Sequence, residues 1–286
     1  MFVRPAVTAD LDAMVALAAR LQARPERHIG YLGVDPESIR SDVADVDDWV
    51  ARTVVLDDAG TLAGWILAET DSDMGRTWWW GPFAVDGADD RTLDLLYQRA
   101  SAAGSPEEEM APDDRNRQAA RLAERNGFRG ETASAVLRYE GAGFGGTGGT
   151  RQLQAGDRAA VAALHDRLFP GTHSPGRLLV ASEDPRLVAV VDGEVAGYVA
   201  IELHSDRSGY IDYLGVDAAF RRRGIARRLV MDATDRLLES GAGSVNLTVR
   251  ESNAAARRLY ESIGFAHERL VRPYRKGFSL EDQTTA

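Results

Sequence analysis

Six consecutive residues in the second half of the chain have the composition of an anion-binding loop. They are Arg221, Arg222, Arg223, Gly224, Ile225 and Ala226. The apolar run 210–216 before them is typical of a strand, and the run 227–238 after them is typical of a helix. Free backbone N–H groups and the positive end of the helix dipole meet where such a helix begins. Because Gly224 lets the backbone approach a ligand closely and the arginines add charge, the pattern predicts a site for a phosphate-bearing ligand.

The spacing of Arg221, Gly224 and Ala226 resembles the Arg/Gln-x-x-Gly-x-Gly/Ala loop that holds the acetyl-CoA pyrophosphate in the GNAT (Gcn5-related N-acetyltransferase) superfamily. For this loop alone, a solvated basic turn is the alternative. Thirty-two residues after Arg221, the segment 253–265 resembles a second GNAT signature, Asn-x-x-Ala-x-x-Leu-Tyr-x-x-x-Gly-Phe. Two signatures in this order and at this distance favour the family over a basic turn. The resemblance covers roughly residues 151–276.

Composition limits the classes of protein that remain. The chain has 286 residues, no cysteine and a formal net charge of −10. The length suits two domains, and the lack of cysteine excludes disulfides, thiolate metal sites and a cysteine nucleophile. Residues 1–150 hold 15 Arg against 26 Asp and Glu, whereas residues 151–286 hold 19 Lys and Arg against 18 Asp and Glu. This balance argues against a nucleic-acid partner, and the less acidic half is the one with the expected anion site.

The sequence also predicts where the protein works. Its first residues lack a charged-then-apolar leader, and no apolar run is long enough to cross a membrane. Together with the missing cysteines, this predicts a cytoplasmic protein with no membrane partner. Heavy use of Ala and Arg beside a single lysine, Lys276, is typical of a GC-rich bacterial genome.

A whole-domain duplication is indicated by matching segments. Residues 116–128 repeat in residues 253–265 at a constant offset of 137, and the expected helix ends Gly104 and Gly241 have the same offset. The Gly-rich run 141–150 between the copies is typical of a flexible linker. Chance similarity is the alternative, and the shared Asn, Ala, Arg-Leu and Gly-Phe positions make it improbable.

The two copies differ at the expected anion site. Residues 83–86 match 214–217 at an offset of 131, so the first copy lacks six residues between its strand and its helix. Six residues is the length of the loop 221–226. The first copy has the acidic run 87–90 there, which would repel a pyrophosphate. These boundaries predict a degenerate GNAT-like domain, a linker and a functional GNAT domain, at residues 1–140, 141–150 and 151–286.

Each copy is predicted to have an α/β (α+β) fold with a mixed central sheet flanked by helices. The expected early elements are strands at 2–7, 50–56, 62–69, 151–154, 187–191 and 195–203 and helices at 8–22 and 156–168. Turn residues 57–60 and 192–193 predict hairpins. Val136–Tyr139 and Glu268–Tyr274 are each expected to close the sheet of their own half.

The resemblance implies roles for individual residues. The loop and Arg227 would hold the pyrophosphate, and the backbone of Leu214 and Val216 would pair with the pantetheine arm. Asn253 would contact CoA, although Asn is also a preferred helix cap. Tyr260 lies where the family often has the general acid that protonates the CoA thiolate, which a phenol can do at neutral pH. Packing is the alternative for Tyr260, whose place in the first copy is taken by alanine.

The general base is less well defined by the sequence. Many family members have Glu where this chain has Tyr210, so the chain departs from that pattern. Asp212 comes two residues later, on the same face of an alternating strand, and a half-buried carboxylate there would have a raised pKa. Tyr210 and Asp212 are expected to line the acceptor site. The alternatives are that Asp212 only bonds a loop, that Glu202 is the base, or that water molecules carry the proton.

Three other groups of residues are interpreted as structural. Trp78 and Trp80 are expected on one face of a strand and Trp79 on the other, in the core or around an apolar ligand. The histidines lack ligand spacing, so no metal site is predicted at His165, His173 or His204. The run Glu107–Glu109 is expected to be a solvated loop.

Together these observations predict one active site, in the second copy, that transfers acetyl from acetyl-CoA to a primary amine of a small molecule. The tandem plan is also similar to that of the mycothiol synthases, which gives a more specific alternative. A non-catalytic CoA-binding sensor or scaffold is the third possibility. The chain is expected to be a monomer or a homodimer.

Overall fold

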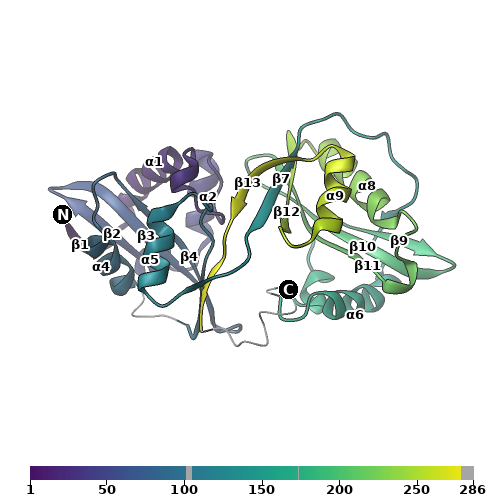
Figure 1. The fold of residues 1–286 in the computed structure, drawn as a ribbon, viewed down its shortest axis with the longest axis horizontal. Coiled ribbons are helices and arrows are strands. Elements are labelled where there is room, and N and C mark those ends of the chain that lie inside the picture. Colours follow the sequence, from purple (N-terminus) through teal and green to yellow (C-terminus); the bar gives the residue numbers. More distant parts are fainter. Residues whose placement is uncertain (101–104, 173, 278–286) are drawn as a thin grey trace. The chain divides into compact units, whose positions relative to one another are not determined.

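The computed structural model describes residues 1–100, 105–172 and 174–277, which form two compact units. Among the described residues, unit 1 contains 1–134 and 269–277, and unit 2 contains 135–268. Each unit is built on a mixed seven-stranded sheet (Figure 1). The predicted fold class is confirmed. Gly104 and His173 lie outside the described residues.

The sheet of unit 1 has the strand order β1-β2-β3-β4-β5-β14-β6. Its strands are β1 Phe2–Pro5, β2 Thr53–Asp58, β3 Thr61–Asp71, β4 Arg76–Ala84, β5 Glu107–Met110, β6 Arg129–Gly130 and β14 Tyr274–Lys276. Its helices are α1 Leu11–Gln22, α2 Pro36–Asp45, α3 Trp49–Arg52, α4 Asp90–Ala100 and α5 Arg117–Arg125. One apolar cluster joins the sheet to α1 and α2, and a second joins its other face to α4 and α5.

The sheet of unit 2 has the order β13-β7-β12-β11-β10-β9-β8. Its strands are β7 Ser134–Tyr139, β8 Arg151–Gln152, β9 Arg186–Val191, β10 Glu194–Leu203, β11 Ser208–Val216, β12 Ser244–Arg250 and β13 Ala266–Val271. Its helices are α6 Arg158–Leu168, α7 Gly176–Leu179, α8 Ile225–Glu239 and α9 Ala254–Ile263. Helices α6 and α7 pack on one face of this sheet, and α8 packs on the other.

Local signals in the sequence give correct elements. Both predicted hairpins are present, with positive φ at the central turn residues: Ala59 (51°), Gly60 (87°), Asp192 (52°) and Gly193 (84°). Such turns match the twist of the flanking strands. The β4 tryptophans alternate as predicted, since Trp79 belongs to one core cluster and Trp80 to the other. Residues 50–52 belong to helix α3 and not to the predicted strand. The Thr53 hydroxyl bonds the Trp49 carbonyl at 2.7 Å at the end of this helix, and β2 begins at Thr53.

The run Glu107–Glu109 is a buried strand, so the prediction of a solvated loop was wrong. Glu108 is 6% exposed and Glu109 8% exposed. The Glu108 carboxylate accepts hydrogen bonds from Trp79 Nε1 (2.9 Å) and the Tyr97 hydroxyl (2.6 Å) and pairs with Lys276 Nζ at 2.8 Å. Arg275 pairs with Glu109 at 2.6 Å. Partners far apart in the sequence therefore satisfy charges that a local reading assigns to solvent.

The closing strands do not remain in their own halves. Strand β7, which follows unit 1 in the sequence, lies between β13 and β12 in the sheet of unit 2. Strand β14, near the end of the described chain, lies between β5 and β6 in the sheet of unit 1. The predicted run Glu268–Tyr274 is interrupted at residues 272–273. Each sheet is thus completed by a strand from the other half of the sequence, and this corrects the prediction that each half closes its own sheet.

The Gly-rich run 141–150 has no helix or strand, but it is held against α8. Asp235 accepts hydrogen bonds from the backbone N–H groups of Phe144 (2.5 Å) and Gly146 (2.7 Å). Asp232 accepts bonds from the Thr147 N–H (2.6 Å) and from the hydroxyls of Thr147 and Thr150. The predicted flexibility is therefore reduced by two helix carboxylates that bind the exposed backbone.

Candidate active site

A β-bulge interrupts β11 at Asp212. Ala200 of β10 pairs with Tyr213, and the next residue of β10, Ile201, pairs with Ile211, so Asp212 is an extra residue. The bulge reverses the alternation of side chains: a Cβ at Gly209 would meet Leu237 of α8, whereas a Cβ at Gly215 would meet Leu168 of α6. Strict alternation puts both positions on one face.

The bulge places the predicted residues of β11 on two faces. Tyr213 packs against His165 and Phe169 on the α6 side. Tyr210 lies on this side as well, because it alternates with Gly209, which faces α8. The Val216 side chain lies on the α8 side, near Leu229. The predicted acceptor-site and pantetheine-site residues therefore belong to different stretches of one strand, on either side of the bulge.

Strands β11 and β12 separate at the bulge. Their parallel pairing runs only from Ser208 opposite Ser244 to Ile211 opposite Leu247. Strand β11 continues to Val216 and β12 to Arg250 without further pairing between them. The backbone of residues 212–216 is therefore available on this edge for an extended ligand, which can pair with it as an added strand would.

The loop before α8 has the backbone conformation of an anion site. Arg222 (φ 64°) and Gly224 (φ 74°) are left-handed, and α8 begins directly afterwards. Alternation of right- and left-handed residues turns successive N–H groups toward one point. Within the described residues, no hydrogen bond is formed by the backbone N–H groups of residues 222–227. Gly224 has no side chain to cap them, so the start of α8 is open to an anion.

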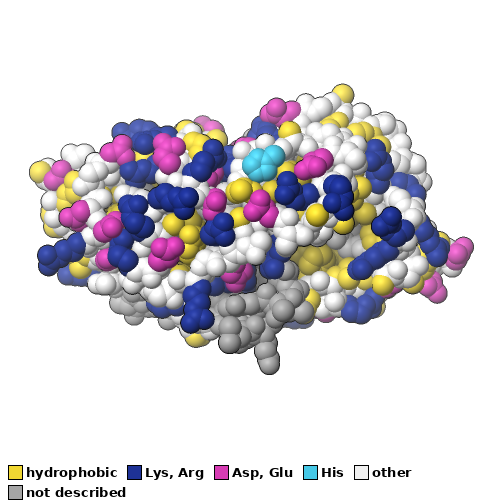
Figure 2. Space-filling view, viewed as in Figure 1, with side chains coloured by type: hydrophobic (Ala, Val, Ile, Leu, Met, Phe, Trp, Pro, Cys, Tyr) yellow, Lys and Arg dark blue, Asp and Glu magenta, His cyan; other side chains and the backbone are white. Residues whose placement is uncertain are grey.

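Five arginines surround this helix end, and none forms an ion pair with another described residue: Arg221, Arg222, Arg223, Arg227 and Arg228. Their contacts are weak or local; Arg221 Nε, for example, donates to the Val216 carbonyl at 3.2 Å and Arg227 to the Ser262 hydroxyl at 2.9 Å. On the face shown in Figure 2, dark-blue side chains gather over unit 2 with few acidic neighbours, whereas both signs interleave over unit 1. The open helix end is thus surrounded by uncompensated positive charge.

Two acids, Asp212 and Glu202, lie beside the bulge. Burial, and secondly the negative charge of Glu202, raises the pKa of Asp212 to about 7, while Arg186 and His204 act in the opposite direction. Glu202 pairs with Tyr210 across the strands, and the His204 ring stacks on Tyr210 at 5.7 Å between centroids. A carboxylate with a pKa near neutrality can take up and release a proton under physiological conditions.

Tyr260 lies on α9 with its ring buried and its hydroxyl accessible. The side chain is 7% exposed, but the hydroxyl is not among the fully buried unpaired atoms and forms no hydrogen bond with a described residue. Burial, and secondly the nearby Tyr210, raises the pKa of Tyr260 to about 12. Asn253 caps α9, since its side-chain oxygen accepts from the Ala256 N–H at 3.1 Å. Tyr260 and Tyr210 are therefore brought near each other, while Asn253 has the capping role that the sequence allowed.

Two residues on this face were not singled out by the sequence. The buried Nε of Arg186 and the Oδ1 of Asn246 each lack a hydrogen-bond partner among the described residues. Asn246 lies opposite Tyr210 on β12, and Arg186 lies two strands from the bulge. Neither belongs to a signature pattern. They stand out only because each has a buried polar atom without a hydrogen-bond partner among the described residues.

The described ranges contain no candidate metal cluster and no membrane-spanning helix. Among residues 1–100, 105–172 and 174–277, no group of three or more His, Asp or Glu side chains has the geometry to hold a metal ion. Over the same ranges, no helix combines the length and apolar character needed to cross a membrane.

Comparison with known proteins is consistent with this geometry. The family model for the acetyltransferase (GNAT) family matches residues 158–265. N-alpha-acetyltransferase 30 of Xenopus laevis is 36% identical over 95 residues, which cover 32% of this chain and 35% of that protein. Mycothiol acetyltransferase of Thermomonospora curvata is 38% identical over 74 residues, 26% of this chain and 25% of that protein. The chain spans about a third or less of the length of these relatives.

Two solved structures share the fold over nearly the whole chain. A GCN5-related N-acetyltransferase from Sphaerobacter thermophilus has a TM-score of 0.74 at 20% identity, covering 96% of this chain and 95% of that one. A tandem GNAT protein from the clavulanic acid biosynthesis pathway has a TM-score of 0.68 at 12% identity, covering 97% and 99%. Residues 158–265 thus match the model of the acetyltransferase (GNAT) family, and the full length of the chain shares the fold of a tandem GNAT protein.

Proposed function

We infer that unit 2 transfers the acetyl group of acetyl-CoA to a primary amine of a small molecule, and that unit 1 has no such activity. The open N-terminus of α8 supports this most directly, because its free N–H groups and unpaired arginines suit the CoA pyrophosphate. The free edge of residues 212–216 begins near that helix end and leads back toward the bulge. A pantetheine arm extended along this edge would bring the thioester to Asp212.

In this proposal, the amine nitrogen attacks the thioester carbonyl and the carbon–sulfur bond breaks. Asp212, with its raised pKa, takes the proton that the amine loses, directly or through a water molecule. Tyr260 remains protonated at neutral pH and gives its proton to the departing CoA thiolate. Asn253 contributes by fixing the start of α9, the helix on which Tyr260 lies. The loop and the arginines supply position rather than chemistry.

A specific alternative is an acetyltransferase like mycothiol synthase. It is favoured by the similarity of part of the chain to the Thermomonospora curvata mycothiol acetyltransferase. Both proposals use the same acetyl-CoA site and differ only in the acceptor. A non-catalytic sensor that binds CoA would have the same helix end but would not need Asp212 and Glu202 beside the bulge.

The decisive experiment measures thiol release from acetyl-CoA in the presence of a panel of amines that includes the amino sugar–cysteine acceptor of mycothiol synthesis. Release that depends on one acceptor, with an acetylated product of the expected mass, would establish the transfer and its substrate. Tight acetyl-CoA binding by calorimetry without release for any amine would favour the sensor. The absence of acetyl-CoA binding would refute all three functions.

A further inference from the structure

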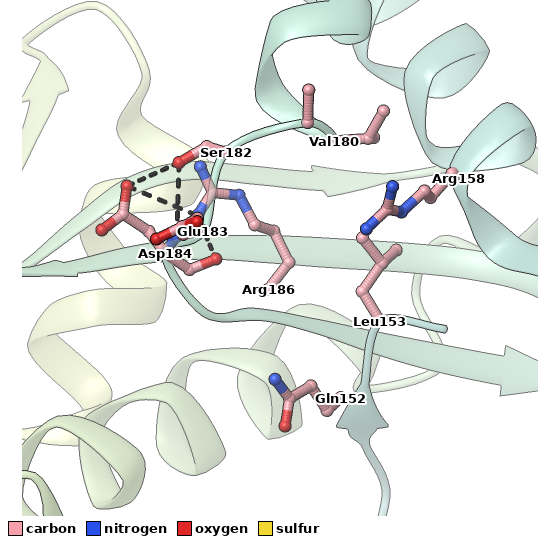
Figure 3. Close-up of a pocket in the computed structure, with 9 residues that line it drawn as sticks. Gln152, Leu153, Arg158, Val180, Ser182, Glu183, Asp184 and Arg186 are labelled. Carbon is pink, nitrogen blue, oxygen red and sulfur yellow. Dashed lines mark hydrogen bonds and ion pairs between the residues drawn. The ribbon is translucent and has the colours of Figure 1, made fainter. Parts of the chain in front are cut away.

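A cavity of about 410 Å³ opens in unit 2 beside the first strands of its sheet (Figure 3). Its lining consists of Gln152, Leu153, Arg158, Val180, Ala181, Ser182, Glu183, Asp184 and Arg186. A volume of this size holds a small metabolite. None of these residues belongs to the CoA loop, the strand edge or α9, so the cavity is separate from the site described for acetyl-CoA.

Arg186 is the buried cation of this cavity. Its side chain is only 5% exposed, yet its Nε has no hydrogen-bond partner among the described residues. The other end of the guanidinium is held by the Asp184 carbonyl, and the Asp184 carboxylate is 3.8 Å from Nη1. An unsatisfied N–H on a buried charged group is costly, and an anionic ligand would satisfy it.

Arg158 gives the cavity a second cation. It lies at the start of α6, is exposed, and forms no ion pair with a described residue. Figure 3 shows Arg158 and Arg186 on either side of the cavity, with Asp184 on the far side of Arg186 from Arg158. The remaining acid, Glu183, is exposed. The space between the two guanidinium groups is therefore the part of the cavity that suits a negative group.

The sheet fixes the distance from this cavity to the bulge. Arg186 pairs with Ala200, and Ala200 pairs with Tyr213, the neighbour of Asp212. Residues directly opposite each other share a face, so Arg186 lies on the α6 side with Tyr213. Neighbouring strands are about 4.8 Å apart, which puts the backbones of β9 and β11 about 10 Å apart. A short molecule can therefore reach from one to the other.

We propose that this cavity binds an anionic group of the acceptor, so that the preferred substrate is a small amine that also has a carboxylate or a phosphate. Arg158 and Arg186 hold the anion, while the amine lies at Asp212, within the proposed acetyl-transfer site on which this inference rests. The separation favours an amine and an anion several bonds apart over a simple α-amino acid.

The test compares acceptors that differ only in the negative group. With acetyl-CoA, kcat/KM is measured for glycine, β-alanine, γ-aminobutyrate and δ-aminovalerate, for the amide of each, and for aminoethylphosphonate. We expect the best acid to exceed its amide by about 10- to 100-fold, the range of a charge-assisted contact. The phosphonate distinguishes a phosphate site from a carboxylate site. Equal rates for acids and amides would overturn the proposal.

Substitutions of the two arginines test whether this cavity is the source of the preference for acids over amides. Arg186→Gln should bring the ratio of acid to amide close to one, and Arg158→Gln should lower it several-fold. Arg236→Gln, an exposed arginine at the other end of α8, should leave it unchanged. Unchanged acetyl-CoA binding shows that a variant is folded. If Arg186→Gln does not fold, exposed Arg158 decides the outcome, and a ratio unaffected by Arg158→Gln contradicts the proposal.

Failure of the proposed acetyl transfer can be distinguished from failure of the anion site. If no amine is acetylated, calorimetric titration of γ-aminobutyrate and of inorganic phosphate into the full chain tests the cavity alone. Binding that weakens in Arg158→Gln and not in Arg236→Gln would support the anion site without acetyl transfer. No binding of either probe would refute it.

Discussion

The two units share the same plan but differ at the start of the helix that follows the central strand, which is α4 in unit 1 and α8 in unit 2. In unit 1, the Asp89 carboxylate accepts from the Thr92 N–H at 2.8 Å and closes the start of α4. Asp86, just before it, is paired with Arg24 and Arg27. In unit 2, Gly224 leaves the start of α8 open among unpaired arginines. A few residues thus decide whether a helix end is satisfied by its own chain or is left for a ligand.

The units also differ beside the bulge. In unit 1 the register shift lies between Trp65 and Leu67, where residues 81–82 of β4 stand opposite one residue of β3, and Trp80 pairs directly with Leu67. The Trp80 ring is buried and its Nε1 bonds the Glu69 carboxylate at 3.1 Å. Ala123 replaces Tyr260. At its register shift unit 1 thus has Gly81 and Pro82, which have no titratable side chain, where unit 2 has Asp212.

Separating the two halves of the sequence should have the largest effect of the changes considered, because it should prevent both units from folding. Fragments 1–140 and 151–286 would each lack an interior strand, and the first would bury Glu108 and Glu109 without Lys276 and Arg275. Breaking a buried ion pair costs about 3–5 kcal/mol, a large part of a domain's stability. We expect neither fragment to show a cooperative thermal transition, whereas the intact chain does. Two fragments that fold alone would contradict the exchange of strands.

The second prediction converts unit 2 to the arrangement of unit 1. Gly224→Asp adds a side chain at φ 74°, a capping carboxylate and a negative charge at the expected pyrophosphate position. Acetyl-CoA affinity should fall by about two orders of magnitude or more, since αL strain and lost charge-assisted bonds add. Calorimetry measures it. Gly243→Ala, in open space on the same unit, is the matched control and should bind normally.

Tyr260→Phe should reduce turnover by about 10²- to 10⁴-fold with little change in acetyl-CoA affinity, because the hydroxyl acts only as the thiolate leaves. Steady-state kinetics at saturating acetyl-CoA, with chemistry shown to be rate-limiting, provide the measurement. Tyr139→Phe removes a hydroxyl that bonds the Ala142 carbonyl elsewhere in unit 2 and should leave turnover within about twofold. A similar loss in both variants would assign Tyr260 to packing.

Asp212→Asn should have a smaller effect that depends on pH. With a pKa of about 7, Asp212 is a base above neutrality, so wild-type kcat/KM should rise through pH 7 and reach a plateau, and the variant should lose this rise. Between the ordinary pKa of 3.8 and pH 7 the folded state binds more protons than the unfolded state, so stability falls as pH rises through this range. The variant should therefore melt higher than wild type at pH 8. An unchanged pH profile would place the base elsewhere.

Local signals made much of this fold predictable. Gly-containing turns, Asn caps and a Gly at the end of α9 act within a few residues, and the predicted hairpins and helices followed from them. The exchanged strands were not predictable, because the sequences of β7 and β14 do not indicate which of the two sheets each strand joins. Glu107–Glu109 looked solvated since its partners, Arg275 and Lys276, lie more than 160 residues away.

The candidate site divides in the same way. The loop before α8 was recognisable from its spacing, and its backbone N–H groups have no partner among the described residues, but its role as a pyrophosphate site stays a prediction. The bulge at Asp212 depends on the pairing of two strands and cannot be read from one of them. Arg186 is ordinary in sequence, and only its burial beside a cavity gives it significance.

The placement of β14 has a consequence for synthesis on the ribosome. Residues of unit 1 leave the exit tunnel first, but the strand between β5 and β6 is encoded about 140 residues after Ser134. At 5–20 residues per second, the nascent unit waits roughly 7–28 s with a gap in its sheet and uncompensated glutamates. Unit 1 therefore cannot finish folding before nearly all of unit 2 has been translated, and the two sheets receive their last strands, β13 and β14, at almost the same time.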